Sequence, residues 1–316
     1  MKVRLIIIMM GVSLAVCAAP AQIFETNLGP SGTIGNGTIG VYTTSGATVN
    51  NALVSGLAVP FGIALSGGNL FVAGAEFLGP GNWTIGEYNA TTGATVNSTL
   101  VAGLQNPTGI VVSGNRMFVS DFGHNAIGVY TTSGATVNSA LVSGLDGPQG
   151  IALSGENLFV ANENNGTIGV YNATTGATVN SALVSGVIGA FGIALSGNTL
   201  FVVNDGRIGE YNATTGAPIN PALISGLSTP GYLALSGGNL FVVDEGSFPQ
   251  FNGTIGEYNA TTGATVNTAL ISGLDRPVGI VVATATSVPD ASSTWTLLLL
   301  GLVAALGLKV VLLRKA

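Results

Sequence analysis

Short apolar runs separated by turn-forming residues repeat along most of this chain. In residues 148–186 these runs are GIAL, NLFVA, TIGVY and ATVNSALV, with clusters of Gly, Asn, Ser and Thr between them. Each run has the length of a β-strand, and the clusters suit tight hairpin turns. Helices are disfavoured because every window contains glycine or β-branched residues. The pattern predicts four consecutive strands, which we name a, b, c and d.

This segment recurs, and a tyrosine in strand c marks each copy. Successive tyrosines are 40 to 47 residues apart: Tyr42, Tyr88, Tyr130, Tyr171, Tyr211 and Tyr258. A period of this size is typical of a four-stranded propeller blade. The five complete copies begin near Pro60, Pro107, Pro148, Ala190 and Pro230.

Neither end of the repeat region completes a copy by itself. The C-terminal end supplies a strand a at 279–283, and the N-terminal end supplies strands b, c and d at 23–27, 38–42 and 47–57. Pairing of these pieces predicts an all-β fold, a six-bladed β-propeller over residues 22–284. Closure of the ring removes sheet edges that favour aggregation. An open solenoid is the alternative, but such a fold needs polar caps, and neither end has one.

The N-terminal residues 1–21 have the features of a secretory signal peptide. Lys2 and Arg4 precede an apolar stretch, and small residues follow at 19–21. Cys17 allows a lipoprotein signal as an alternative, although Val16 is bulky for the position before a lipidated cysteine. Cleavage after Ala21 would leave no cysteine, which excludes disulfides and thiol catalysis from the mature protein.

The C-terminus forms a separate module. A linker at 285–294 precedes an apolar segment and a basic end at 295–316, which predicts a transmembrane helix. With Val288, Pro289 and Asp290 at its start, this tail resembles the PEP-CTERM class of sorting signals, in its Val-Pro-Asp variant. The resemblance implies transient membrane anchoring, processing by an exosortase and delivery to the cell envelope or outer surface. An ordinary tail anchor is the alternative.

Charge restricts the partners of the chain. Between residues 22 and 290 the three arginines Arg116, Arg207 and Arg276 stand against all fourteen acidic residues, a formal charge of −11. Nucleic acid is therefore excluded as a partner, because phosphate binding needs clustered Lys and Arg.

The repeats carry further recurring residues: Pro-x-Gly-Ile in strand a, Phe-Val followed by Asp, Asn or Glu in strand b, and Ile-Gly in strand c. In this pattern residues 22–283 resemble NHL-type propellers and streptogramin lyases. The resemblance implies the propeller fold. It does not imply one function, because propellers include enzymes, sensors and scaffolds. The Trp-Phe strand of the lyases is replaced here by Leu-Phe-Val.

In a propeller the b–c and d–a loops share one face, and we expect nine acidic residues there: Glu25, Glu76, Asp121, Asp146, Glu163, Asp205, Asp244, Glu245 and Asp275. Carboxylates near a central channel suit a divalent cation such as Ca²⁺, with Glu76, Asp121, Glu163, Asp205 and Asp244 as candidate ligands. We favour the alternative that Asp and Asn after strand b close a local turn by bonding backbone amides. The same face carries His124, a candidate general base or a simple loop residue.

The b–c loops are long in three copies, which become consecutive when the ring closes. Between the strand-b Phe and the strand-c Gly there are separations of 16, 15 and 15 residues in the closing copy, the first complete copy and the fifth, against 8 to 10 elsewhere. These loops carry Phe77, Trp83, Phe248 and Phe251, which suit stacking on sugars or anchoring a protein partner. Packing of the rings onto their own loops is the alternative.

We therefore expect a secreted, surface-sorted propeller that acts as a binding or structural module of the bacterial envelope or extracellular matrix. Its expected partners are an exosortase-type enzyme, the membrane before processing, and an envelope polysaccharide or surface protein. The alternative is a metal-dependent lactonase- or lyase-like enzyme that uses the acidic loop face. The binding role is favoured because no dense metal-ligand motif and no serine nucleophile motif are found in the sequence.

Overall fold

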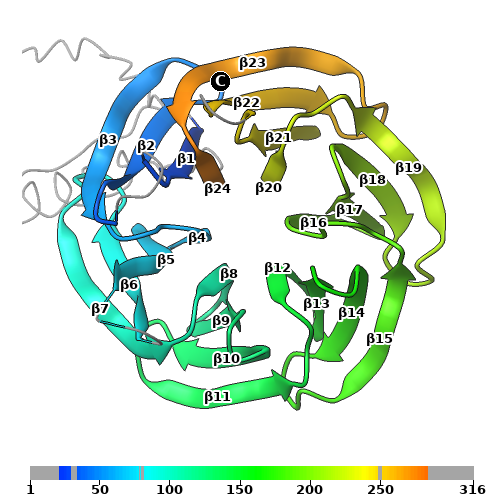
Figure 1. The fold of residues 1–316 in the computed structure, drawn as a ribbon, viewed down its shortest axis with the longest axis horizontal. Coiled ribbons are helices and arrows are strands. Elements are labelled where there is room, and N and C mark those ends of the chain that lie inside the picture. The colour runs from blue at the N-terminus through cyan, green and yellow to red at the C-terminus, as the bar shows by residue number, and fades with distance from the viewer. Residues whose placement is uncertain (1–20, 30–33, 78, 80–81, 248–250, 284–316) are drawn as a thin grey trace, which may run out of the picture. The chain divides into compact units, whose positions relative to one another are not determined.

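The computed structural model describes residues 21–29, 34–77, 79, 82–247 and 251–283. These residues form six four-stranded antiparallel sheets around a common centre (Figure 1). Residues 1–20 of the predicted signal peptide, the sorting motif and the predicted C-terminal helix lie outside the described residues. Within the described ranges, no helix is long and apolar enough to cross a membrane.

Each blade is built in the predicted order from an innermost strand a to an outermost strand d. The innermost strands are β4 (Ile63–Ser66), β8 (Pro107–Ser113), β12 (Pro148–Ser154), β16 (Ile193–Ser196), β20 (Pro230–Ser236) and β24 (Pro277–Ala283). Strands b are β5 (Asn69–Phe77), β9 (Arg116–Asp121), β13 (Asn157–Asn162), β17 (Thr199–Val203), β21 (Asn239–Asp244) and β1 (Gln22–Asn27). Strands c are β6 (Trp83–Asn89), β10 (Ala126–Thr131), β14 (Thr167–Asn172), β18 (Arg207–Asn212), β22 (Asn252–Asn259) and β2 (Gly37–Thr43). Strands d are β7 (Thr95–Leu104), β11 (Thr136–Ser143), β15 (Thr178–Ser185), β19 (Pro218–Ser225), β23 (Thr265–Asp275) and β3 (Thr48–Leu57).

The sixth blade, which we call the closing blade, joins the two ends of the repeat region. Its strand order is β24-β1-β2-β3. β24 pairs antiparallel with β1, with Phe24 opposite Val281. The predicted closure by one C-terminal and three N-terminal strands is therefore confirmed. Blades one to five are the uninterrupted sheets that begin at β4, β8, β12, β16 and β20.

The core of the protein lies between neighbouring blades. Successive side chains of a strand point to opposite faces, so strand b is buried on both sides. In β5, Leu70 and Val72 pack toward the closing blade, whereas Phe71 and Ala73 pack toward blade two. Equivalent apolar clusters fill the other four blade interfaces. Because each blade buries both faces against its neighbours, the stability of the ring depends on all six contacts.

Neighbouring innermost strands approach each other closely at the Pro-x-Gly-Ile glycine. The Gly62 N–H donates to the Thr108 carbonyl of the next blade at 2.8 Å, and Gly150 bonds Phe191 in the same way. A Cβ at Gly62 would overlap the Thr108 carbonyl oxygen, which is why glycine is needed here. In the closing blade a hydroxyl is inserted into this contact. Thr26 Oγ1 accepts from the Gly279 N–H at 2.8 Å and donates to the Phe61 carbonyl at 2.7 Å.

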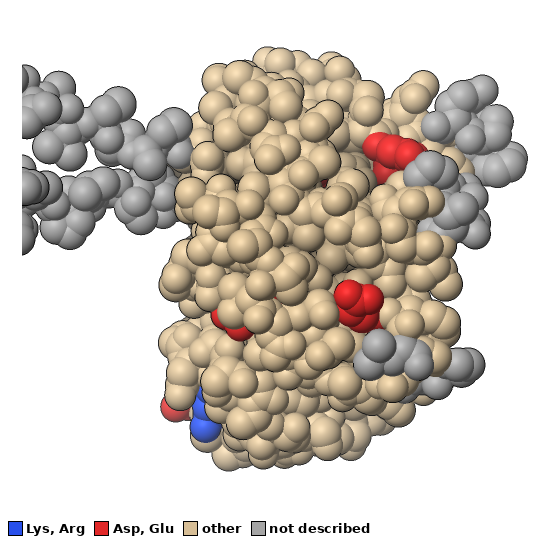
Figure 2. All heavy atoms as spheres, turned by 90° about the vertical axis from the view of Figure 1, so that its left-hand side faces the viewer, with Lys and Arg blue, Asp and Glu red and all other residues tan. Residues whose placement is uncertain are grey.

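The outermost strands carry an Asn that bends the strand. In β11, the Asn138 Oδ1 accepts from the Ala140 N–H at 3.0 Å, and the pairing with β10 shifts register beside it. The same bond recurs in the other five blades. Bulges of this kind protect exposed sheet edges from pairing with other chains. The outermost strands β3 and β7 contain no charged residue, and Figure 2 shows only a few charged side chains on this side of the molecule. Edge protection here therefore comes from backbone shape instead of charge.

Candidate functional site

The polar residue at the end of strand b holds the loop that leads into its own blade. Asp121 Oδ1 accepts from the Gln105 N–H at 2.9 Å, and Asn204 Oδ1 accepts from the Ile188 N–H at 3.0 Å. Asp244 accepts three backbone N–H groups, from Ser228, Thr229 and Gly246. These residues bond backbone amides as predicted, but the predicted local turn is wrong for most of the bonds: only the Gly246 bond is local, and the others reach the d–a loop about sixteen residues earlier. They fix the d–a loops and so stabilise the loop face.

The five candidate metal ligands do not converge. Among the residues that the structure describes, no group of three or more His, Cys, Asp or Glu side chains could hold a metal ion. The carboxylates of Asp121 and Asp244 accept hydrogen bonds from backbone N–H groups. Glu163 accepts a hydrogen bond from the buried Gln149 Nε2 at 2.8 Å. Glu76 is half-buried at the end of β5, and Asp205 is exposed. The arrangement therefore offers single carboxylates spread over the loop face.

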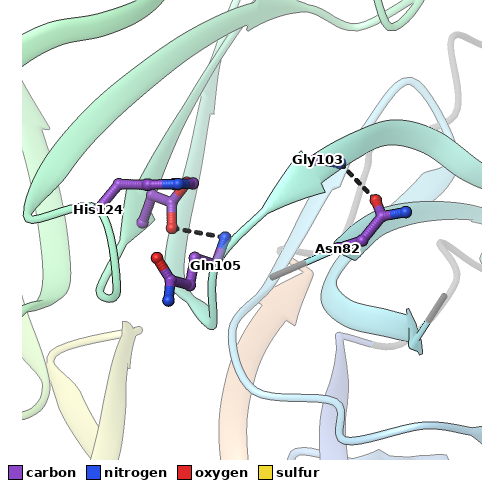
Figure 3. Close-up of polar contacts among 5 residues, drawn as sticks. Asn82, Gly103, Gln105 and His124 are labelled. Atoms are coloured by element: carbon purple, nitrogen blue, oxygen red, sulfur yellow. Dashed lines mark hydrogen bonds and ion pairs between the residues drawn. The ribbon is translucent and has the colours of Figure 1, made fainter. Parts of the chain in front are cut away.

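His124 forms a pair with Asp121. His124 Nδ1 lies 2.7 Å from Asp121 Oδ2, and the imidazole is about half exposed while the carboxylate is almost completely buried. With Nδ1–H as donor to the carboxylate, Nε2 faces outward as a proton acceptor. Figure 3 shows His124 beside Gln105, and the neighbouring Asn82, whose Oδ1 accepts from the Gly103 N–H at 2.9 Å. An oriented imidazole of this kind has the geometry of a general base.

The aromatic residues of the long loops are partly packed. Phe77 and Trp83 lie opposite each other at the head of the β5–β6 hairpin, with ring centroids 4.5 Å apart and planes tilted by 41°. Trp83 also packs against the core between blades one and two. Phe251 lies under the guanidinium of Arg276, with its ring centroid 5.0 Å from Cζ. Phe248 lies outside the described residues. Phe77, Trp83 and Phe251 are each partly buried, so part of each residue is exposed to solvent.

Glu25 departs from the sequence-based placement on the loop face. It lies inside β1, is completely buried, and occupies the position of Val in the other copies, such as Val72 of blade one. Its Oε1 accepts from Asn27 Nδ2 at 2.7 Å, and Oε2 has no hydrogen-bond partner among the described residues. Burial raises the pKa of Glu25 to about 8, although hydrogen bonds from Asn27, Tyr42 and the Gly40 backbone oppose the shift. The carboxyl group therefore holds its proton at neutral pH.

Tyr232 marks a second departure, at the centre of the ring. It stands in blade five where the Pro-x-Gly-Ile pattern has glycine. Its hydroxyl is buried and approaches Thr108 of blade two, but no hydrogen bond of good geometry forms within the described part of the chain. Burial raises the pKa of this phenol above its ordinary value. Tyr232 belongs to β20 of blade five and Thr108 to β8 of blade two, two blades that are not neighbours in the ring, so the side chain of Tyr232 reaches from one innermost strand toward another near the centre.

Comparison with known proteins supports the fold. The sequence matches no protein-family model and no curated protein. A chain from the crystal structure of a nidogen/laminin complex is similar with a TM-score of 0.67 and 17% identity, covering 84% of this chain and 99% of that one. The computationally designed protein Ika8 is similar with a TM-score of 0.48 and 18% identity, covering 77% of this chain and 71% of its own. At such identities the first of these likenesses shows a β-propeller fold, and function must be argued from the site.

Proposed function

We propose that this protein is an exported β-propeller that binds a polysaccharide or a protein partner at the cell envelope. The Phe77–Trp83 pair is the observation that carries the proposal. Two aromatic rings stand on a paired hairpin, and both keep accessible surface on the face where the loops are longest. Aromatic side chains on a rigid support bind sugars and protein surfaces at low entropic cost. The similar chain comes from the crystal structure of a nidogen/laminin complex, which is in keeping with a binding role.

Sorting by the C-terminal tail completes the proposal. The NHL-type repeat and the PEP-CTERM-type tail together fit a surface protein that an exosortase releases from its membrane anchor. The mature protein is then expected to lack residues 1–21 and everything after about Val288. Intact mass measurement of surface material tests this, with Asp290→Ala as the variant that should keep the tail. Surface material that still contains residues 295–313 would contradict sorting by cleavage.

Fluorescence gives a direct test of binding, because the chain has two tryptophans, Trp83 and Trp295. In a Trp295→Phe variant all tryptophan emission comes from Trp83. Envelope polysaccharide from the producing bacterium should change this emission in a saturable way, and Phe77→Leu should weaken the binding while the fold remains. An unchanged spectrum with both polysaccharide and surface-protein extracts would contradict a binding role for the pair.

A lactonase- or lyase-like activity is the second candidate, and the Asp121–His124 pair is the observation that favours it. An imidazole oriented by a buried carboxylate suits proton abstraction. The test is a panel of lactones and cyclic depsipeptides, with and without added Ca²⁺. Any turnover should be lost in His124→Gln, because Gln cannot act as a base at neutral pH. Turnover that survives this substitution would exclude His124 as the base.

A further inference from the structure

A hollow of about 170 Å³ opens between blades four and five, on the face of the b–c and d–a loops. Ile188 and Phe191 line it from the loop into blade four, and Thr229 and Pro230 from the loop into blade five. Asp205 lines it from the turn between β17 and β18. This turn is the shortest b–c connection in the chain, so no long loop of blade four covers the hollow.

Ile188 is an exposed apolar side chain on a fixed backbone. Its side chain is 69% exposed, although its N–H donates to Asn204 Oδ1 and its carbonyl accepts from the Asp205 N–H, both at 3.0 Å. The corresponding positions of the other copies hold small or polar residues: Ala58, Gln105, Asp146, Ser228 and Asp275. Burial in the core therefore does not explain the isoleucine. The isoleucine therefore gives the hollow an apolar wall that is open to solvent.

Asp205 places a negative charge at the same hollow. Its carboxylate is exposed and makes no hydrogen bond or ion pair within the described residues. The backbone φ of Asp205 is +43°, in the left-handed region. Apart from glycine, Asp and Asn are the residues that adopt this region most readily. The protein as a whole is acidic, with three arginines, no lysine and fourteen acids in residues 22–290, although the exposed Arg207 follows Asp205 by two residues. The site therefore attracts cations.

We propose that this hollow binds the side chain of a lysine or arginine from a protein partner. The methylene stem would lie against Ile188 and Phe191, and the cationic end would pair with Asp205. Long basic side chains combine these two properties, because their stems are apolar and their ends are charged. The proposal rests on the binding role proposed above, and it specifies a protein partner with an accessible basic side chain on the acidic loop face.

Methyl-labelled isoleucine in the full chain tests the proposal. The probes are N-acetyl-lysine methylamide and N-acetyl-arginine methylamide, with the norleucine analogue as the matched compound that lacks the charge. The Ile188 methyl resonance, assigned with Ile188→Val, should shift saturably with one or both cationic probes and much less with norleucine. Asp205→Asn, which suits the positive φ, should weaken binding by about 1.4- to fivefold, the range of an exposed ion pair. Asp275→Asn, at an exposed acid that ends strand β23, should leave it unchanged.

Several outcomes would overturn the proposal. Equal binding of norleucine, or equal affinity in Asp205→Asn, would remove the role of the charge. A shift caused by methyl β-glucoside and not by the cationic probes would assign the hollow to sugar. Phe77→Leu separates the two sites: it should weaken binding at the aromatic pair without changing the Ile188 titration. Loss of one titration with the other intact therefore shows which of the two proposals has failed.

Discussion

Glu25 should make the stability of the propeller depend on pH in an unusual direction. Most carboxylates stabilise a fold when ionised, but this one is buried, and its pKa is raised from 4.5 to about 8. Between these two values the folded state binds more protons than the unfolded state. The contribution of Glu25 to the free energy of unfolding is therefore largest below pH 4.5 and falls as the pH rises toward 8.

The size of the effect follows from the shift. Each pH unit within the window changes the free energy of unfolding by about 1.4 kcal/mol for one group, so the contribution between pH 5 and pH 7.5 is about 3 kcal/mol. For a domain of this size such a change corresponds to about 6–12 °C in melting temperature. The loss should appear first in the closing blade, where Glu25 pairs with Gly40 across β1 and β2.

Thermal unfolding of the wild type and of Glu25→Gln from pH 4.5 to 8.5 measures this contribution. Glutamine keeps the size and the hydrogen-bonding oxygen but does not ionise, so the variant should lose this part of the pH dependence. The difference between the two melting curves should therefore widen toward alkaline pH, with the variant the more stable protein there. Parallel pH profiles would refute the argument, because they would mean that Glu25 ionises with an ordinary pKa or is hydrated in solution.

Three further predictions concern the ring and its loops. Deletion of residues 22–27 should expose the edges of β24 and β2 and cause aggregation; a chain that stays monomeric in light scattering, with unchanged melting, would contradict closure. Thr26→Val removes the hydroxyl between Gly279 and Phe61 and should cost about 1–3 kcal/mol of unfolding free energy in urea, whereas Thr48→Val on the exposed strand β3 should cost less than about 0.5 kcal/mol. Asp244→Ala leaves three backbone N–H groups without their acceptor and should cost about 1–3 kcal/mol, with faster amide exchange in the loop into blade five; unchanged exchange there would show that solvent replaces the carboxylate.

Much of the fold could be predicted because the same pattern of four strands recurs in each copy of the repeat. The last copy has only strand a, and the first copy has only strands b, c and d. The pairing of β24 with β1 could therefore be predicted from the sequence, although its register could not. The Asp and Asn residues after strand b could be assigned to backbone bonds because turn chemistry is local. Their partners, about sixteen residues earlier in the chain, become apparent only when the d–a loop is seen beside strand b.

The site was less predictable because it depends on departures from the repeat. Glu25 was expected on the loop face, although its alignment with Val72 already indicated an inward position. Tyr232 in place of glycine was a signal of the same kind, but its approach to Thr108 requires the geometry of the closed ring. The partial burial of Trp83 depends on packing against blade two, which no local pattern encodes.

The aromatic pair and the hollow lie on one face of the protein only if the ring of blades is closed. Gln22 and Ala283 are register partners across β1 and β24. In a Cys17→Ser background, Gln22→Cys with Ala283→Cys should form an intramolecular disulfide under mild oxidation, because opposed residues of paired strands lie within disulfide range. The product should migrate faster than its reduced form on a denaturing gel, and Thr48→Cys on the outermost strand with Ala283→Cys should not cross-link. Two free thiols in the first pair, or equal cross-linking of both pairs, would contradict closure of the propeller by its two ends.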